Sequence, residues 1–151
     1  MALLAVVAGV VLFVLLQRRV LIEESLIYIV ALIPSIILHE VSHGAAALAF
    51  GDDTAKRAGR LTLNPVPHID PLGTVVLPAV LILTTGTAFG WARPVPVDVG
   101  RLRSPRNHSL VVSLVGPGVN IAIALLVALV VRLVTVQGTT AQFLFALGFA
   151  N

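Results

Sequence analysis

The sequence predicts an all-α polytopic membrane protein, a bundle of about four to five transmembrane helices in one domain that covers residues 1–151. Hydrophobic residues make up 58% of the chain, charged residues make up 11%, and the mean hydropathy of +1.03 exceeds the usual range of soluble domains. A helix needs about 20 apolar residues to cross the hydrocarbon core of a bilayer. The long apolar stretches are Ala2 to Gln17, Ser25 to Phe50, Thr74 to Ala92, Ser109 to Val131, and one from Leu133 towards Asn151.

The first apolar stretch is expected to be a retained span and not a signal peptide. No basic residue precedes its apolar run, whereas Arg18 and Arg19 follow it. The second and third stretches are joined by residues 51–73, and the third and fourth by residues 93–108. Both connections are rich in Pro and Gly, which favour turns over helix.

The net charge of +3 comes from ten Lys and Arg against seven Asp and Glu, and the basic residues gather in the connections. This distribution favours contact with the head groups of a lipid bilayer, and we expect no nucleic-acid partner. If the spans alternate in direction, the basic residues divide six to four between the two sides of the membrane, which leaves the orientation open. The four are Lys56, Arg57, Arg60 and Arg132.

The second apolar stretch contains ILHEVSHGAAA, which runs from Ile37 to Ala47. On a helix, His39 and His43 are four residues apart and lie one above the other on the same face. Glu40 lies about 100° around the helix, close enough to act on water at a metal without being a ligand. This spacing is the His-Glu-x-x-His arrangement of zinc hydrolases. An ionisable side chain at the centre of a span costs about 2.5–3.5 kcal/mol, so three together indicate a functional metal site inside the bilayer.

Two histidines do not complete a catalytic zinc site, which takes three protein ligands and an open position. The chain contains no cysteine, so any further ligand supplies nitrogen or oxygen. Asp70 and His68 are the candidates for a third ligand, and either could instead orient a ligand or its loop. Asp52, Asp53 and Asp98 are expected to be solvated loop residues.

The fourth apolar stretch contains Gly-Pro-Gly at positions 116 to 118, followed by Asn120. The three residues predict a break in the helix, and broken backbone at membrane depth is tolerated where it packs on protein or lines a wet cavity. We therefore expect Asn120 to lie on a water path to the metal. The alternative is a simple kink in which Asn120 bonds to a neighbouring helix.

Four motifs together resemble the site-2 protease family of intramembrane zinc metalloproteases, and most of all its short bacterial branch. In chain order they are HEVSH, NPVPHIDPLGT, GWARPVPV and SLVGPGVNIAIAL, and the resemblance runs from about Ile33 to Leu126. It implies that His39 and His43 bind zinc and that Glu40 is the catalytic acid and base. It also implies that a loop beside the active site contains Asn64, Pro65, His68 and Asp70, and that the helix facing the site contains Asn120.

The chain departs from the family at the third zinc ligand, which in that family is an aspartate followed by glycine in a later helix. The sequence contains no Asp-Gly pair, and its last residues, FLFALGFAN, resemble the segment that leads into that motif. We expect a metalloprotease core that is incomplete at its C-terminus. The alternatives are that an internal residue such as Asp70 replaces the ligand, or that the protein no longer cleaves.

The resemblance implies an intramembrane zinc metalloendopeptidase of the bacterial inner membrane, which cleaves peptide bonds within or near transmembrane segments of client proteins. The alternative is a non-catalytic pseudoprotease or zinc-binding membrane scaffold. A metal transporter fits less well, because transport needs ligands on several spans and here the polar groups gather at one level of the second span. The sequence does not indicate an oligomeric state.

Overall fold

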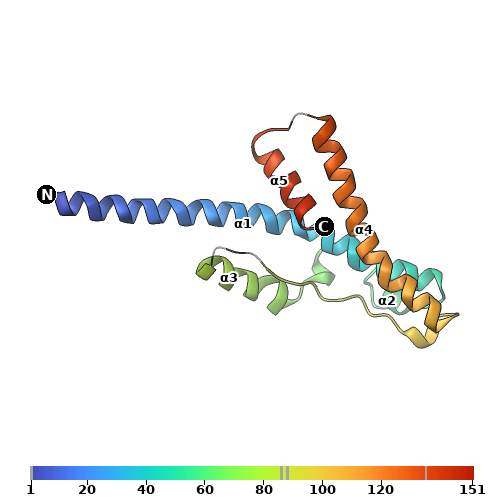
Figure 1. The fold of residues 1–151 in the computed structure, drawn as a ribbon. Helices are drawn as coiled ribbons and strands as arrows, with labels where there is room; N and C mark the ends of the chain where they lie inside the picture. The colour runs from blue at the N-terminus through green and yellow to red at the C-terminus, as the bar shows by residue number, and fades with distance from the viewer. Residues whose placement is uncertain (1, 86, 88, 135) are drawn as a thin grey trace.

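The computed structural model of the protein describes residues 2–85, 87, 89–134 and 136–151, and it describes side chains from residue 22 onward except that of Glu24. All regular elements within these ranges are helical (Figure 1). The α-helices are α1 (Ala2–Ala49), α2 (Thr54–Arg57), α3 (Leu77–Thr85), α4 (Pro105–Leu133) and α5 (Gly138–Phe149). Two 3-10 turns, η1 (Val66–His68) and η3 (Val99–Arg101), and a π-helical turn, η2 (Pro71–Val76), lie in the connections.

The first two predicted spans form one continuous helix, α1, of 48 residues. At 1.5 Å per residue this helix is about 72 Å long, and its N-terminal half extends away from the other helices (Figure 1). Arg18 and Arg19 do not interrupt it, because arginine is a good helix former. The side chains of Ala2 to Gln17 lie outside the description, so the membrane placement of that stretch stays a prediction.

Within the described residues, two helices are long and apolar enough to cross a membrane, namely Ser25–Ala49 and Pro105–Leu133. The third predicted span forms only η2 and the nine-residue α3, and the fifth forms the twelve-residue α5. Both helices are shorter than the roughly 20 residues that a span needs. The all-helical class is therefore observed, but a bundle of four to five spans is not confirmed.

Helix α4 continues through Gly-Pro-Gly, contrary to the predicted break. Pro117 removes one backbone hydrogen bond and its ring lies on the exposed side of the helix, so the remaining bonds preserve the helix around it. Gly116 is buried against α1. Gly116 therefore allows α1 and α4 to approach each other closely, which is a common role of small residues at helix contacts in membranes.

Helix α1 packs against α4 and α5, and these two form a hairpin whose helices also contact each other (Figure 1). The buried core is small and lies near the C-terminal end of α1, where Ala47, Leu102 and Val112 pack together. Away from this core, large apolar side chains are exposed, such as Leu110 at 61% and Leu125 at 67%. Such exposure is costly in water and favourable in contact with lipid.

A Schellman motif ends α1. The Gly51 N–H donates to the Leu48 carbonyl at 3.1 Å, the Asp52 N–H donates to the Ala47 carbonyl at 2.9 Å, and Gly51 adopts a φ of 108°. Glycine takes this left-handed conformation without the steric cost of a Cβ atom. The chain therefore reverses at once, and Asp52 lies directly beneath the last turn of α1.

The basic connections meet at this end of the molecule. The Asp53 carboxylate pairs with Arg57 at 3.2 Å and with Arg101 at 3.0 Å, which joins the first connection to the second. The six-to-four division of charge assumed that Thr74 to Ala92 crosses the membrane, and the structure does not confirm that span. Seven basic residues lie in the two connections, residues 51–73 and 93–108, namely Lys56, Arg57, Arg60, Arg93, Arg101, Arg103 and Arg106.

Candidate metal centre

His39 and His43 lie one turn apart on α1, and their side chains converge. Their Nε2 atoms are 3.0 Å apart, and the two rings meet edge to face with centroids 4.7 Å apart. Two Zn–N bonds of 2.0–2.1 Å at a tetrahedral angle would separate the nitrogens by about 3.3 Å. The separation is therefore close to the one that a single bound zinc ion requires.

A hydrogen bond to α4 fixes the tautomer of His43. Its Nδ1 atom lies 2.6 Å from the backbone carbonyl oxygen of Val112, and a carbonyl oxygen can only accept, so Nδ1–H is the donor. The Nε2 atom then carries the lone pair that a metal needs. Metal-ligating histidines commonly donate their other N–H to a carbonyl or carboxylate in this way.

Gly116 on α4 lies next to the two imidazole rings, and its lack of a side chain gives them room. A Cβ atom at this position would lie 2.7 Å from His39 Nε2 and 2.6 Å from His43 Cε1, and closer still to His43 Nε2. The ends of both imidazoles therefore lie directly against Gly116, where any other residue would place its side chain. A pair of imidazole nitrogens facing a common space fits a zinc ion.

The Glu40 carboxylate is held beside the histidines by the extended segment after α3. The backbone N–H of Val95 donates to Glu40 Oε2 at 2.8 Å, while Oε1 has no hydrogen-bond partner among the described residues. Glu40 and His43 line a common cavity of about 370 Å³, which also includes Val95, Ser109 and Ser113. One carboxylate oxygen is thus anchored and the other is available to a reacting group.

The structure does not bring Asp70 or His68 to the histidine pair. Within the described part of the chain, no group of three His, Cys, Asp or Glu side chains could hold a metal ion. Asp70 Oδ1 accepts hydrogen bonds from the backbone N–H groups of Leu72 at 3.1 Å and Gly73 at 2.7 Å, as the N-cap of η2. The second predicted role, that of orienting the loop, matches this geometry.

His68 is 2% exposed, and its Nε2–H donates to the Thr62 carbonyl at 3.0 Å. Its Nδ1 atom is buried without a partner. Asn64 is exposed, and its side-chain oxygen accepts from the Val66 N–H at 3.0 Å, which shapes the same loop. Both residues therefore build the loop, and no contact joins either of them to the histidine pair.

Asn120 lies on α4 one turn beyond Gly116, and therefore on the same helix face. Its side-chain oxygen is buried and has no hydrogen-bond partner in the part of the chain that the structure describes. A buried amide oxygen without a partner favours a nearby water or polar ligand, since most buried polar groups in proteins are satisfied. The predicted water path remains a prediction.

The sequence reasoning missed the role of Asp52, which it took for a solvated loop residue. Asp52 is fully buried, and its Oδ2 accepts from the Asp98 N–H at 2.7 Å. Its Oδ1 accepts from the backbone N–H of Thr54 at 3.0 Å and from the Thr54 hydroxyl. A C-terminal Gly before the aspartate signals the helix end, but no sequence pattern revealed that the side chain turns inward.

Burial alone would raise the pKa of Asp52, because it disfavours the charged form. The hydrogen bonds from Thr54 and Asp98, together with the charge of Arg101 at 3.8 Å, outweigh burial and hold the pKa below its usual value. Asp52 is therefore a buried carboxylate anion near neutral pH. Its negative charge is balanced by the basic residues of the joined connections.

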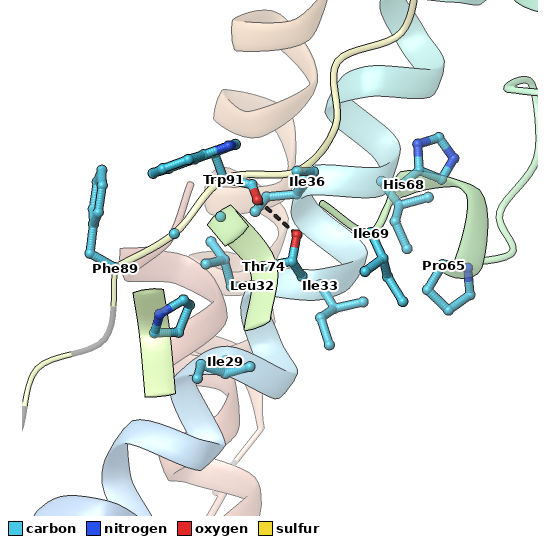
Figure 2. A pocket seen from close by; sticks show the side chains of 15 residues that line it. Ile29, Leu32, Ile33, Ile36, Pro65, His68, Ile69, Thr74, Phe89 and Trp91 are labelled. Atoms are coloured by element: carbon cyan, nitrogen blue, oxygen red, sulfur yellow. Dashed lines mark hydrogen bonds between the residues drawn. The ribbon is translucent and has the colours of Figure 1, made fainter. Parts of the chain in front are cut away.

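Another cavity, of about 240 Å³, lies between α1 and the segments 65–74 and 89–92 (Figure 2). Apolar side chains of α1, among them Ile29 and Ile33, line one side of it. Across the cavity, the Thr74 hydroxyl donates to the Trp91 carbonyl at 2.8 Å, the bond drawn as a dashed line in Figure 2. This bond ties the loop that contains His68 to the segment that reaches Glu40.

Comparison with known proteins gives several curated relatives. The chain is 48% identical over 96 residues to "Putative zinc metalloprotease YwhC" of Bacillus subtilis, which covers 64% of this chain and 41% of that protein. It is 33% identical over 95 residues to "Putative zinc metalloprotease Rip2" of Mycolicibacterium smegmatis, covering 61% of this chain and 34% of the relative. The Rip2 protein of Mycobacterium tuberculosis is 35% identical over 99 residues, covering 66% and 37%.

The aligned region therefore represents about two fifths or less of the length of each of these relatives. None of the protein-family models matches the chain, and no solved structure matches it.

Proposed function

We propose that this chain belongs to the site-2 protease family and forms the zinc-binding catalytic core of an intramembrane metalloendopeptidase. The observation that carries the proposal is the convergence of His39 and His43, whose Nε2 atoms are 3.0 Å apart in front of Gly116. The nearby Glu40 supplies a carboxylate with one anchored oxygen. The names of the relatives, which are zinc metalloproteases, support zinc as the cofactor.

When bound, zinc supplies a Lewis acid that polarises a peptide carbonyl and makes a water molecule acidic enough to react near neutral pH. His39 and His43 would hold the ion through Nε2, and the Val112 carbonyl keeps the His43 ring in the tautomer that permits this. Glu40 accepts the proton of the attacking water at Oε1 and passes it to the leaving amine, while Val95 keeps Oε2 in place. No covalent bond forms between the protein and the substrate.

The proposed substrate is a transmembrane segment of another protein. The candidate site lies on a helix long and apolar enough to cross a bilayer, and the surrounding helices expose large apolar side chains. A substrate helix hides its carbonyl groups in its own hydrogen bonds, so it must unwind locally before water can attack. We propose the bacterial inner membrane as the location, with the lipid bilayer as the surrounding medium.

A catalytic zinc site has three protein ligands, and two are assigned here. A measurement of zinc content shows whether the third protein ligand lies within these 151 residues. The 151-residue chain would be purified in mild detergent, and zinc per polypeptide would be measured for the wild type, His39→Ala and His43→Ala. One zinc per chain that is lost in both variants assigns the third ligand to these 151 residues, whereas a folded chain without zinc assigns it to a residue outside them.

Glu40→Gln separates a protease from a non-catalytic zinc scaffold. The amide keeps the size of the side chain but cannot accept the proton of the attacking water. For a protease we expect cleavage of a transmembrane substrate to fall by at least a factor of about 100 with zinc content unchanged. Equal cleavage by the wild type and Glu40→Gln would refute the proposed chemistry.

A further inference from the structure

An extended segment, residues 91–98, crosses the active-site helix and contacts Glu40 at its middle. We call this segment the strap. Val95 is buried, with its side chain beside Gly44 on α1, where an added Cβ atom would come within 2.9 Å of it. Gly44 lies one helical turn after Glu40 and so shares its face. The absence of a side chain at Gly44 lets the Val95 N–H reach the Glu40 carboxylate.

The loop around η1 and η2 fixes the N-terminal end of the strap. The Trp91 N–H donates to the Gly73 carbonyl at 3.2 Å, and the Arg93 N–H donates to the His68 carbonyl at 2.9 Å. The Thr74 hydroxyl donates to the Trp91 carbonyl. These bonds resemble the pairing of two short strands, and they hold the segment before Val95 from one side.

Asp52 fixes the C-terminal end of the strap through the Asp98 N–H. Pro94 and Pro96 flank Val95 and have no N–H, so the strap makes few hydrogen bonds of its own between its two anchors. The Val95–Glu40 bond therefore depends on where the two ends are held. The C-terminal anchor is a single bond, but its acceptor is a fully buried carboxylate, and charged hydrogen bonds are about twice as strong as neutral ones.

We propose that Asp52 is a positioning residue for Glu40, acting through the strap. The inference rests on the proposed function only for the role of Glu40 in proton transfer. The two oxygens of Asp52 accept hydrogen bonds from different parts of the chain: Oδ1 accepts from Thr54 at the start of α2, and Oδ2 accepts from the Asp98 N–H of the strap. An asparagine at this position keeps one oxygen for Thr54 but presents an NH2 group to the Asp98 N–H, and two donors cannot bond to each other.

The test uses hydrogen–deuterium exchange of the full-length protein in detergent micelles, read by mass spectrometry on peptides that cover residues 91–98. Asp52→Asn is expected to raise the exchange rates of the Val95 and Asp98 amides by on the order of 10-fold, the effect of losing one charged hydrogen bond. Asp53→Asn is the matched control. It removes the same charge from the next residue, whose ion pairs with Arg57 and Arg101 do not involve the strap, and should change exchange by less than about 2-fold.

Activity gives the second readout, on a fluorescent reporter that consists of one apolar span with a central Gly-Pro pair. A displaced general base slows the chemical step without weakening binding, so we expect Asp52→Asn to lower kcat by about 10- to 100-fold with KM and zinc content within about 2-fold. Exchange at Val95 is measured without any substrate. A wild type that binds zinc but cleaves no reporter therefore refutes the proposed function alone, whereas unchanged Val95 exchange in Asp52→Asn refutes the positioning role alone.

A disulfide covers the case in which Asp52→Asn does not fold. The chain has no cysteine, so the pair Asp52→Cys and Asp98→Cys can form only one disulfide within a chain, and crosslinked dimers are removed by size. In the reduced form this double variant should show fast Val95 exchange, and oxidation should restore both slow exchange and kcat. If the neutral disulfide restores slow Val95 exchange and kcat, Asp52 acts by tethering the strap. If an oxidised, folded chain recovers neither, the tethering role is refuted.

Discussion

Gly116→Ala tests the candidate metal centre more directly than removal of a ligand, because it leaves every proposed zinc ligand in place. The added Cβ atom would lie 2.7 Å from His39 Nε2, whereas ordinary van der Waals contact begins at 3.4 Å. His39 must therefore recede by about 0.7 Å, and His43 by more, if the helices keep their positions. Metal–ligand distances tolerate changes of only about 0.2 Å.

The magnitude follows from what the imidazoles lose when they move. Displacement of His43 breaks its bond to the Val112 carbonyl, and loss of such an orienting partner alone costs about 10- to 100-fold in metal affinity. The shift of both ligands adds to this loss. We therefore expect zinc affinity to fall by at least about 100-fold, or about 2.7 kcal/mol. The fold should survive, because side-chain ends can rotate away and alanine is a better helix former than glycine.

The assay is a competition titration of zinc between the protein and a fluorescent chelator, with the melting temperature measured on the same samples. Gly118→Ala is the control, because it lies on the same helix two residues later and a Cβ atom there meets nothing within 4 Å. It should bind zinc like the wild type. If Gly116→Ala binds zinc within 3-fold of the wild type, the ion is not held in the space that Gly116 leaves open.

Three further predictions concern the surroundings of the site. Folding lowers the pKa of Asp52, so its carboxylate stabilises the protein at pH values above its unfolded pKa of 3.8, and this contribution is lost as the pH falls through the native pKa. The free energy of unfolding of Asp52→Asn should therefore fall less steeply with acid than that of the wild type. Urea titrations between about pH 6 and pH 3 measure this difference. Gly73→Ala would place a Cβ atom in steric overlap with the Trp91 indole ring. It should therefore destabilise the protein by about 1–3 kcal/mol in the same titration, with no such loss in Gly118→Ala. The end of the molecule where the two basic connections meet should face the cytoplasm. A single cysteine at Lys56 should then react with a membrane-impermeant maleimide only after the cells are opened, whereas one at Gln137, between α4 and α5, should react in intact cells. The reverse pattern would place the basic connections outside the cell.

The histidine pair could be predicted from the sequence because it depends on local geometry alone. A spacing of four residues on a helix brings two side chains together whatever the remaining fold does, and the structure has His39 and His43 in contact. The predicted break at Gly-Pro-Gly was wrong for the opposite reason. One proline removes one backbone bond, and whether the helix survives depends on the packing around Gly116, which the sequence pattern does not contain.

Asp52 shows a second limit of the sequence. An aspartate after Gly51, next to a second aspartate and followed by basic residues, has the composition of a solvated loop. Its burial arises because the strap returns to the end of α1 from 46 residues away, as the bond to Asp98 shows. A contact across that distance leaves no periodic signal, so only the folded structure could reveal it.

The four motifs that carried the family resemblance now share a physical explanation. HEVSH contains the two imidazoles and Glu40, and SLVGPGVNIAIAL contains Gly116, against which the imidazoles lie. GWARPVPV makes up most of the strap, and NPVPHIDPLGT holds the N-terminal end of the strap through the carbonyl groups of His68 and Gly73. The second and third motifs therefore act on Glu40 through the backbone, by holding one amide in place. Their side chains cap turns and pack, as Asp70 and Trp91 do, and this accounts for polar residues near the site that are not brought to the histidine pair. Substitutions in these two motifs should accordingly slow the chemical step before they affect zinc content, whereas substitutions in the first and fourth motifs should remove the metal itself.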